Sequence, residues 1–282
     1  PYGYKGSPSA FNNQVSKSVL RGLHWKKVFA YVDDMLTIGK SFSDSLHALE
    51  NVLARLLSYN LKIKPEKTVI MKKEVRMLGH VINGSTISLD PVKMRAAALW
   101  DTPKTKRDVL SFCQFVNFMR KSIPDFAGVA RPLYNLCGDT PFEWTETHEK
   151  SFQYLKHAVS TAPVLHLPDF KKAMFLVTDW SKISGAYALL QRERNDKGAW
   201  HPILFGSIPM SKTQSSSLSS YNGELLTLAT AVEETKQYLD VAPSVVVITD
   251  HYSIKHIFNQ KVLSAYQLRM IQKVSSVNNI TI

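Results

Sequence analysis

Two short apolar runs in the second half of the chain constrain its fold most, because both have the length of a strand and both end in Thr-Asp. They read "AMFLVTD" (173–179) and "SVVVITD" (244–250). Between them the sequence predicts strands at "AYALLQ" (186–191) and near "HPILFG" (201–206), and a helix that begins near Tyr221. Strands mixed with helices in this way predict an α/β domain.

Acidic side chains stand at the ends of these two predicted strands. If both strands share one sheet, Asp179 and Asp250 emerge at one edge, and Glu224 falls in or near the first turn of the intervening helix. Clustered carboxylates raise each other's pKa unless a cation binds, and hard divalent cations prefer oxygen ligands. An Asp after a strand is also a common turn or helix cap. Either Thr-Asp alone favours that role, whereas the three acids together favour a metal site.

The stretch "FAYVDDMLTIG" (29–39) poses the same question in the first half. β-Branched and aromatic residues on both sides of Asp33 and Asp34 predict a hairpin. Side chains alternate along a strand, so the two acids should point differently, and one can face a metal while the other supports it. The usual Asn-Gly or Asp-Gly turn is missing. From spacing alone, a cation site and a polar turn with two solvated acids are equally good interpretations.

The remaining elements follow from periodicity and capping residues. In chain order we expect a helix capped by Ser7 and running to about Leu20, a helix over 43–59, a strand over 75–82 and a short strand within 84–90. Residues 90–162 are expected to form short helices, divided by Pro91, Pro103, Pro124, Pro132 and Pro141. A Ser-rich loop is expected over 211–220.

Charge and cysteine content narrow the class of protein. Lys and Arg number 35 against 23 Asp and Glu, a formal charge of +12, which indicates a polyanionic partner, most simply nucleic acid. No apolar run reaches the length of a membrane span, and no secretion signal is visible. Cys113 and Cys137 form no metal-ligand pattern and favour a reducing compartment. We therefore expect an intracellular protein that does not bind a membrane.

An ordered series of segments resembles a known family. "YVDD" within an apolar hairpin resembles the catalytic box of reverse transcriptases, and "PYGYKGSPSAF" resembles the segment before that box. "LKIKPEKT" and "RMLGHVI" follow in the family's order. The stretches "TPKTKRDVLSFCQFVNFMRKSIPDF" and "FEWTETHEKSFQYLKHAV" are similar to its connecting region, and "TDWSKISGAYALLQ", "YNGELLTLATAVEE" and "VVVITDHYSIKHIF" to its ribonuclease H domain. The chain as a whole resembles the Pol polyprotein of gypsy-type LTR retrotransposons.

This resemblance implies an α/β (α+β) chain in three parts. They are a partial polymerase palm over 1–89, a helical thumb or connection over 90–162, and a ribonuclease H-like mixed-sheet domain over 163–282 that is incomplete at its C-terminal end. The implied activities are RNA-directed DNA polymerase and ribonuclease H, acting by two-metal phosphoryl transfer and hydrolysis. The implied partners are an RNA template, a DNA primer, an RNA/DNA hybrid, deoxynucleoside triphosphates and other parts of the same polyprotein, in a cytoplasmic virus-like particle or the nucleus.

The resemblance also assigns roles to single residues. Asp33 and Asp34 match the catalytic, metal-binding pair of the polymerase, and Asp179, Glu224 and Asp250 match metal-binding acids of the nuclease. The cofactor implied is Mg²⁺, two ions per active site, with Mn²⁺ as the alternative ion. Residues implied to contact template, primer or nucleotide are Gly3, Tyr31, Lys67, Gly79 and His80.

Three departures from the family pattern shape the expectations. The family's first polymerase aspartate and fourth nuclease acid have no counterpart, since residues 1–32 and 251–282 contain no Asp or Glu. Trp180 stands where many relatives carry a small residue, so its side chain is expected to cover the site or shift the strand. We therefore expect an internal fragment that does not extend a primer by itself. The alternatives are a non-catalytic, nucleic-acid-binding remnant of a retroelement and an unrelated basic α/β protein.

Overall fold

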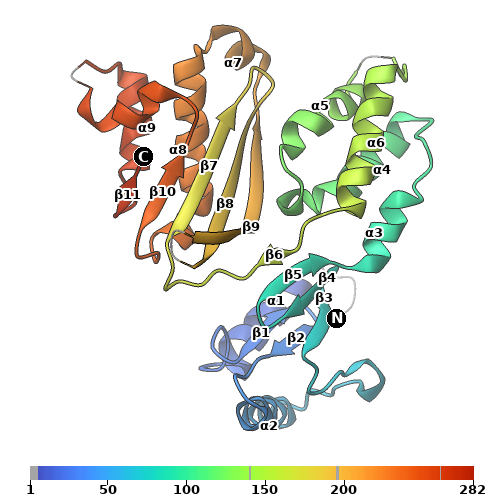
Figure 1. Ribbon diagram of the computed structural model, residues 1–282. Coiled ribbons are helices and arrows are strands. Elements are labelled where there is room, and N and C mark those ends of the chain that lie inside the picture. The colour runs from blue at the N-terminus through green and yellow to red at the C-terminus, as the bar shows by residue number, and fades with distance from the viewer. Residues whose placement is uncertain (1–5, 140, 195–196, 261) are drawn as a thin grey trace. The chain divides into compact units, whose positions relative to one another are not determined.

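The computed structural model describes residues 6–139, 141–194, 197–260 and 262–282, so Gly3 lies outside the described residues. The chain divides into two compact units, Pro1–Met77 and Leu78–Ile282 (Figure 1). Both units mix helices with strands, which confirms the expected α/β class. Among the described helices, none combines the length and the apolarity that crossing a membrane requires.

The first unit is built on a two-stranded hairpin and two helices. Its elements are α1 (Ser7–Gln14), which continues as a π-helical stretch (Val15–Val19), β1 (Val28–Tyr31), β2 (Asp34–Thr37), α2 (Phe42–Ser58), a 3₁₀ turn (Pro65–Lys67) and β3 (Glu74–Met77). β1 and β2 pair antiparallel with Phe29 opposite Leu36. Buried Val19, Val28 and Leu56 join the helices to the hairpin in one apolar core. The predicted hairpin and the helix over 43–59 are therefore confirmed.

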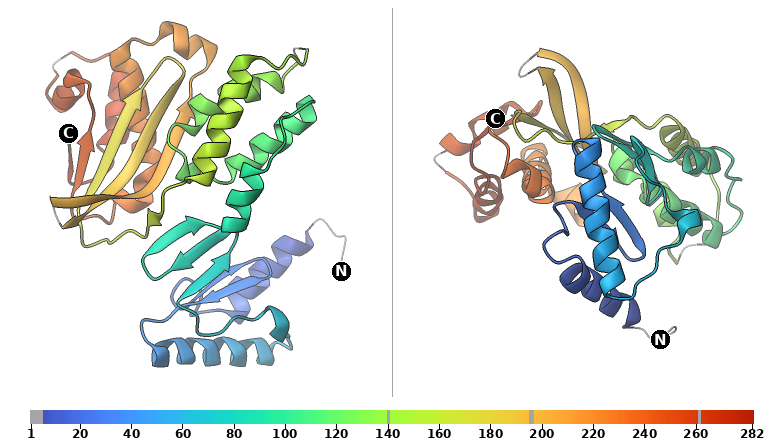
Figure 2. Two further views of the ribbon diagram at one scale, coloured as in Figure 1. Left: turned by 45° about the vertical axis from the view of Figure 1, so that its right-hand side comes forward. Right: turned by 90° about the horizontal axis from the view of Figure 1, so that it is seen from below.

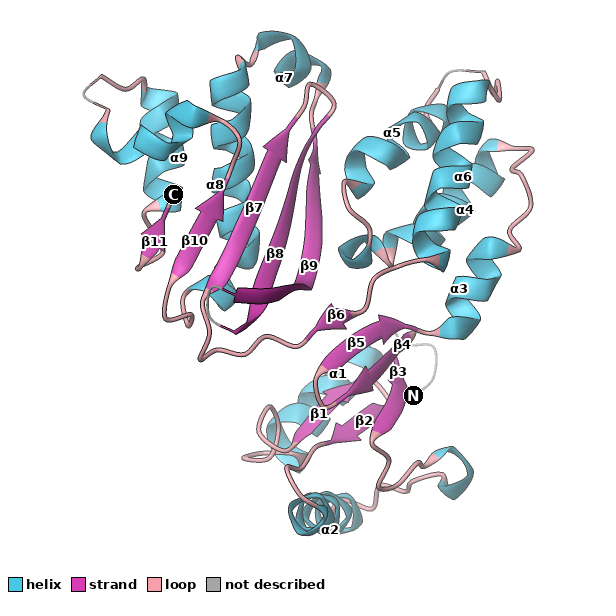
Figure 3. Ribbon diagram, in the orientation of Figure 1, coloured by secondary structure: helices cyan, strands magenta, loops and turns pink. Residues whose placement is uncertain are grey.

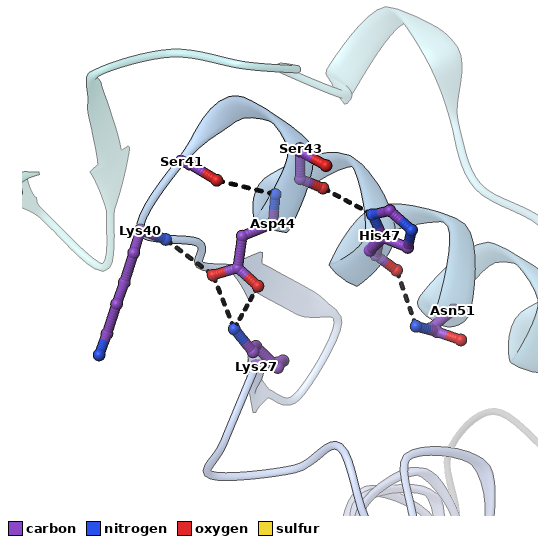
Figure 4. Close-up of polar contacts among 7 residues, drawn as sticks. All are labelled: Lys27, Lys40, Ser41, Ser43, Asp44, His47 and Asn51. Carbon is purple, nitrogen blue, oxygen red and sulfur yellow. Dashed lines mark hydrogen bonds and ion pairs between the residues drawn. The ribbon is translucent and has the colours of Figure 1, made fainter.

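A polar network anchors the start of α2 beside the hairpin (Figure 4). The Asp44 backbone N–H donates to the Ser41 hydroxyl at 3.2 Å, which caps the helix. The Asp44 carboxylate accepts from the Lys27 ammonium at 2.5 Å and from the Lys40 backbone N–H at 2.8 Å. The bond from Lys27, followed by the one from Lys40, lowers the pKa of Asp44 below its usual range. This carboxylate therefore serves the fold of the first unit.

Two local predictions in this region are wrong. The residue at the cap of α1 is Gly6, and Ser7 is already helical, with no side-chain cap bond. Proline is tolerated in the first turn because the N–H groups there have no acceptor within the helix, so the helix can begin one residue before the position predicted. The single strand predicted over 75–82 is interrupted, because Leu78 and Gly79 have φ of +51° and +71°. A strand cannot pass through two left-handed residues.

The second unit opens with an antiparallel sheet and four helices. They are β4 (His80–Asn83), β5 (Thr86–Leu89), α3 (Pro91–Ala98), α4 (Lys106–Asn117), α5 (Phe126–Leu136), α6 (Glu146–Ser160) and β6 (Leu165–His166), which pairs with β5. The rings of Phe112 and Phe152, both fully buried, meet at 4.6 Å between α4 and α6. Pro132 lies inside α5, so the break predicted there is wrong. Burial of Phe126, Leu133 and Leu136 at about 1.5–3 kcal/mol each exceeds the roughly 3 kcal/mol that an internal proline costs.

The rest of the second unit is a mixed five-stranded sheet with helices (Figure 3). Its strands are β7 (Met174–Trp180), β8 (Ser184–Arg194), β9 (Lys197–Pro209), β10 (Val245–Ile248) and β11 (Ile280–Thr281), and its helices are α7 (Lys212–Ser217), α8 (Ser220–Leu239) and α9 (Ala265–Val274). The strand order is β11-β10-β7-β8-β9. β7 is antiparallel to β8 and parallel to β10. The further views of the ribbon show α8 lying along this sheet (Figure 2). Leu225 and Leu228 of α8 join Leu176 and Leu189 of the sheet in one core, and all four are fully buried.

The Ser-rich loop predicted over 211–220 contains a helix instead. Ser211 and Gln214 form a reciprocal capping box at the start of α7. The hydroxyls of Ser216 and Ser217 donate to backbone carbonyls one turn earlier, at 3.1 and 2.7 Å. Serine therefore satisfies backbone groups inside this short helix, where the composition had indicated a loop.

Candidate metal centre and its surroundings

Three acids of the second unit come together at the C-terminal ends of the neighbouring strands β7 and β10. Asp179 is the next-to-last residue of β7, and Asp250 follows the end of β10 by two residues. β7 and β10 are parallel neighbours, with Val177 opposite Ile248, so their C-terminal ends meet. One carboxylate oxygen each from Asp179, Asp250 and Glu224 of α8 lie within 4.8 Å of one another. Within the described residues, this is the one group of three or more His, Cys, Asp or Glu side chains placed to hold an ion.

Glu224 is the buried acid of this cluster. It is only 4% exposed, whereas Asp179 and Asp250 are exposed. Burial, followed by the charges of the neighbouring Asp250 and Asp179, raises the pKa of Glu224 to about 7, against the opposing effect of a backbone hydrogen bond from Trp180. Its Oε2 atom is buried and has no hydrogen-bond partner among the described residues.

This donor set fits a hard divalent cation. All three side chains offer carboxylate oxygens, which Mg²⁺ prefers over nitrogen or sulfur ligands. A buried oxygen without a partner is destabilising unless something binds it, because its lost hydration is not replaced. A cation at this position would bind that oxygen and neutralise the mutual repulsion of the acids. The gathering of the acids follows from the strand ends as expected, and their role as metal ligands stays a prediction.

Trp180 packs against the helix that carries Glu224. A Cβ atom at Gly223 would lie 2.1 Å from Cε2 of Trp180, so the indole occupies the space that any other residue at 223 would need. The register from Phe175 opposite Leu190 to Trp180 opposite Gly185 is continuous. Of the two effects expected of Trp180, a register shift of β7 against β8 is therefore absent, and cover of the site by the indole stays a prediction.

A second close approach lies one turn further along α8. A Cβ at Gly185 would come within 2.2 Å of the Thr227 hydroxyl oxygen, and that hydroxyl donates to the Gly223 carbonyl at 2.9 Å. Two glycines on facing elements thus let α8 approach β7 and β8 closely enough to bring Glu224 to Asp179. Sequence reasoning missed Gly223 and Thr227. The available signal was a glycine inside a strong helical pattern, which costs about 1 kcal/mol and therefore indicates close packing.

The two acids of the first unit lie at the tip of its hairpin. Tyr31 pairs with Asp34, so Val32 and Asp33 form a two-residue turn. Val32 has φ of +51°, an unusual conformation for a β-branched residue. Asp33 and Asp34 are both exposed, and in the described part of the chain they join no cluster of three or more His, Cys, Asp or Glu. The hairpin therefore exposes this pair, and no third acid of the described residues is placed to share an ion with it.

The other predicted contact residues are distributed over both units. Tyr31 and Lys67 belong to the first unit and are exposed, with Lys67 on a 3₁₀ turn. Gly79 and His80 belong to the second unit. A Cβ at Gly79 would lie 2.9 Å from a ring carbon of Phe118, and the His80 ring centroid lies 5.3 Å from that of Phe118. The φ of +71° and the close contact with Phe118 both require glycine at position 79, independently of any ligand.

Two protein families match the chain. The family described as "Reverse transcriptase (RNA-dependent DNA polymerase)" matches residues 1–82, and the family described as "RNase H-like domain found in reverse transcriptase" matches residues 144–246. The first match contains Asp33 and Asp34, and the second contains Asp179 and Glu224. The two matches stand in the order that the sequence motifs predicted.

Curated relatives are similar to this chain over most of its length. The retrovirus-related Pol polyprotein from transposon 412 of Drosophila melanogaster is 30% identical over 260 residues, which cover 92% of this chain and 20% of that protein. The transposon Tf2-3 polyprotein of Schizosaccharomyces pombe is 28% identical over 256 residues, covering 90% of this chain and 19% of the polyprotein. The chain thus spans about a fifth of the length of these relatives.

Solved structures show the fold. A foamy viral protease–reverse transcriptase, described in complex with double-stranded DNA, matches with a TM-score of 0.82 and 21% identity, covering 100% of this chain and 49% of that one. A second, described in complex with an RNA/DNA hybrid, matches with a TM-score of 0.78 and 21% identity, covering 100% of this chain and 38% of that one. With these matches, the chain carries a reverse transcriptase domain and a ribonuclease H-like domain of the kind found in reverse transcriptases, and it is similar to retroelement Pol polyproteins.

Proposed function

We propose that the second unit hydrolyses the RNA strand of an RNA/DNA hybrid with the help of divalent metal ions. The observation that carries the proposal is the acidic cluster at the edge of the sheet, in which Glu224 keeps a buried oxygen without a partner beside Asp179 and Asp250. Its position in a ribonuclease H-like domain supports this reaction. A foamy viral relative in fold, described as bound to an RNA/DNA hybrid, supports the substrate class.

The three acids would hold Mg²⁺, or Mn²⁺ in its place, two ions per active site. When bound, such ions activate water for attack on a phosphodiester and neutralise the charge that develops on the leaving oxygen. Without a cation, Glu224 is mostly protonated below about pH 7. Loss of this proton makes its carboxylate available to bind a metal ion. The Trp180 backbone N–H holds this carboxylate in place. Asp179 and Asp250 are exposed, so substrate could reach the cluster from solvent.

For the first unit we propose a role in RNA-directed DNA synthesis within the whole Pol protein. Asp33 and Asp34, displayed at the hairpin tip, would contribute to a second divalent metal site. Residues proposed to contact RNA template, DNA primer or deoxynucleoside triphosphate are Gly3, Tyr31, Lys67, Gly79 and His80. The same proposal includes a gypsy-type origin and domain limits at 1–89, 90–162 and 163–282. It also includes contacts with other parts of the polyprotein, and action inside a cytoplasmic virus-like particle or the nucleus.

The nuclease proposal is tested with an RNA/DNA hybrid labelled at the 5′ end of its RNA strand, in Mg²⁺ or Mn²⁺. Asp179→Asn is expected to reduce cleavage about tenfold or more, since even indirect supports of a metal site are worth 10–100-fold. Asp240→Asn is the matched control, because Asp240 is an exposed acid that pairs with Lys236 at 2.9 Å. Cleavage that survives Asp179→Asn unchanged would contradict the assignment. Hybrid binding by the parent Pol protein without metal-dependent cleavage would favour a non-catalytic remnant.

A further inference from the structure

A cleft of about 770 Å³ lies between the helical part and the sheet of the second unit. One wall is formed by residues between Asn117 and Asn135, around the start of α5. The other wall comes from β8, β9, the start of α7 and the C-terminal half of α8. None of the three acids at the sheet edge lines it. The cleft is therefore a separate feature from the candidate metal centre.

Hydrogen bonds between lining residues and the sheet hold the two walls together. The Ala127 backbone N–H donates to the Ser207 hydroxyl at 2.7 Å. The Arg131 guanidinium donates to the Ile183 carbonyl at 3.0 Å. The first bond joins α5 to β9 and the second joins α5 to the turn before β8; Figure 1 shows α5 beside β9. A cleft fixed in this way is preformed, so a ligand would lose little free energy in ordering it.

Positive charge dominates the lining of the cleft. Arg120, Lys121, Arg131 and Lys212 contribute four cations, against one carboxylate from Glu234. Arg120, Lys121 and Lys212 are exposed, and none of the salt bridges among the described residues involves them. Three cationic side chains without an acidic partner at one cleft favour an anion, and phosphate matches both guanidinium and ammonium donors.

Tyrosine rings supply the second recognition element. Tyr134 lines the cleft, is 40% exposed and donates its hydroxyl to the Cys113 carbonyl at 3.5 Å. Tyr238 also lines the cleft and is half-buried. The Tyr187 hydroxyl donates to Glu234, so the carboxylate of the cleft is already engaged. Burial raises the pKa of Tyr187, which therefore stays a neutral donor. An exposed tyrosine beside cations offers a flat surface on which a nucleobase can stack.

We propose that this cleft binds a nucleoside phosphate, either a free nucleotide or one nucleotide of a single strand. Its volume falls in the range of sites for small ligands, roughly 300–1,000 Å³. Lys121, Lys212 and Arg120 would bind the phosphate, and Tyr134 would stack on the base. An acidic peptide would satisfy the cations but leave the tyrosine surface without a flat partner, which favours the nucleotide.

The test is a binding titration by calorimetry on the whole chain with EDTA present, so that no cation links phosphate to the acidic cluster. The probes are adenosine 5′-monophosphate, a dT₁₂ oligonucleotide and a hexaglutamate peptide. Lys121→Ala/Lys212→Ala should weaken binding of the nucleotide, the oligonucleotide or both by about tenfold or more, as expected for lost bonds to a charged group. Tyr134→Ala should weaken it in the same way, while Tyr134→Phe should retain it.

The control Lys104→Ala/Lys171→Ala removes the same charge from exposed positions outside the cleft and should bind like the unmodified chain. Weakened binding of adenosine monophosphate identifies a site for free nucleotides, and weakened binding of dT₁₂ alone identifies a site for a strand. The proposal is overturned if neither probe binds, if the cleft variants bind both as tightly as the control, or if hexaglutamate binds as tightly as the nucleotide. Thermal unfolding of each variant confirms that it is folded before the comparison.

Discussion

Replacing Glu224 by Gln should stabilise the metal-free protein above pH 7 and leave its stability unchanged near pH 4. Burial and the two neighbouring acids raise the pKa of Glu224 from 4.5 to about 7 in the folded chain. In the unfolded chain the carboxyl group keeps its ordinary pKa. The folded state therefore binds the proton more tightly, so the free energy of unfolding falls as the pH rises from about 4.5 to about 7.

The size of the effect follows from the shift. One pKa unit corresponds to 1.36 kcal/mol, so the charged form of Glu224 destabilises the fold by about 3 kcal/mol above pH 7. Glutamine has the shape of the protonated acid, keeps an oxygen that accepts the Trp180 N–H, and carries no charge to bury. The Gln variant should thus gain about 3 kcal/mol at pH 8 and almost nothing at pH 4.

Urea unfolding in EDTA, followed at pH 4, 6 and 8, measures this difference. Glu233→Gln is the control on the same helix, because Glu233 is exposed, pairs with Lys273 at 2.9 Å, and should change stability by no more than about 0.5 kcal/mol. Mg²⁺ at about 100 times its Kd should stabilise the unmodified protein by about 2.7 kcal/mol and the Gln variant by less. A variant that is destabilised at pH 8, or that gains equally at pH 4 and pH 8, would refute the reasoning.

Two substitutions and one labelling experiment test the packing of α8, the hairpin turn and the burial of a cysteine. Gly223→Ala should destabilise the second unit by about 1–3 kcal/mol in urea unfolding, despite the higher helix propensity of alanine, because the new Cβ would lie 2.1 Å from Trp180 Cε2. Val32→Gly should stabilise the first unit by about 1 kcal/mol in the same assay, because glycine adopts a φ of +51° without the strain of a β-branched side chain. Burial raises the pKa of Cys113 to about 12, so iodoacetamide at pH 8 should label Cys137 first, as read by peptide mass spectrometry.

Each of these predictions has a result that would contradict it. Gly223→Ala should lose much of its effect in a Trp180→Ala background, and additive effects would deny the contact between them. If Val32→Gly were less stable than the unmodified chain, the stabilisation that the valine side chain gives the turn would exceed the backbone strain at its positive φ. Equal labelling rates for Cys113 and Cys137 would mean that the helical core of the second unit opens as fast as the partly exposed thiol reacts.

Local patterns in the sequence predicted most of the elements, and their failures have local causes. The helix at 42–58 and the hairpin at 28–37 were predicted because apolar periodicity and capping act over a few residues. Pro132 did not end α5, because the buried face of that helix outweighs the proline. The Ser-rich stretch became α7, because serine hydroxyls bond to the preceding turn. In both cases, interactions that composition does not describe decided the outcome.

The sequence by itself determined which residues could carry chemistry, since paired acids at strand ends and a basic composition are visible without a structure. The order of its motifs also predicted a reverse transcriptase domain followed by a ribonuclease H-like domain, as the two family matches confirm. Only the tertiary structure decided that three acids lie within 4.8 Å, because strand order and parallel register are set by contacts between residues about seventy apart. The same holds for Trp180 against Gly223 and for the basic cleft. Such contacts depend on how whole elements pack, which no local pattern encodes.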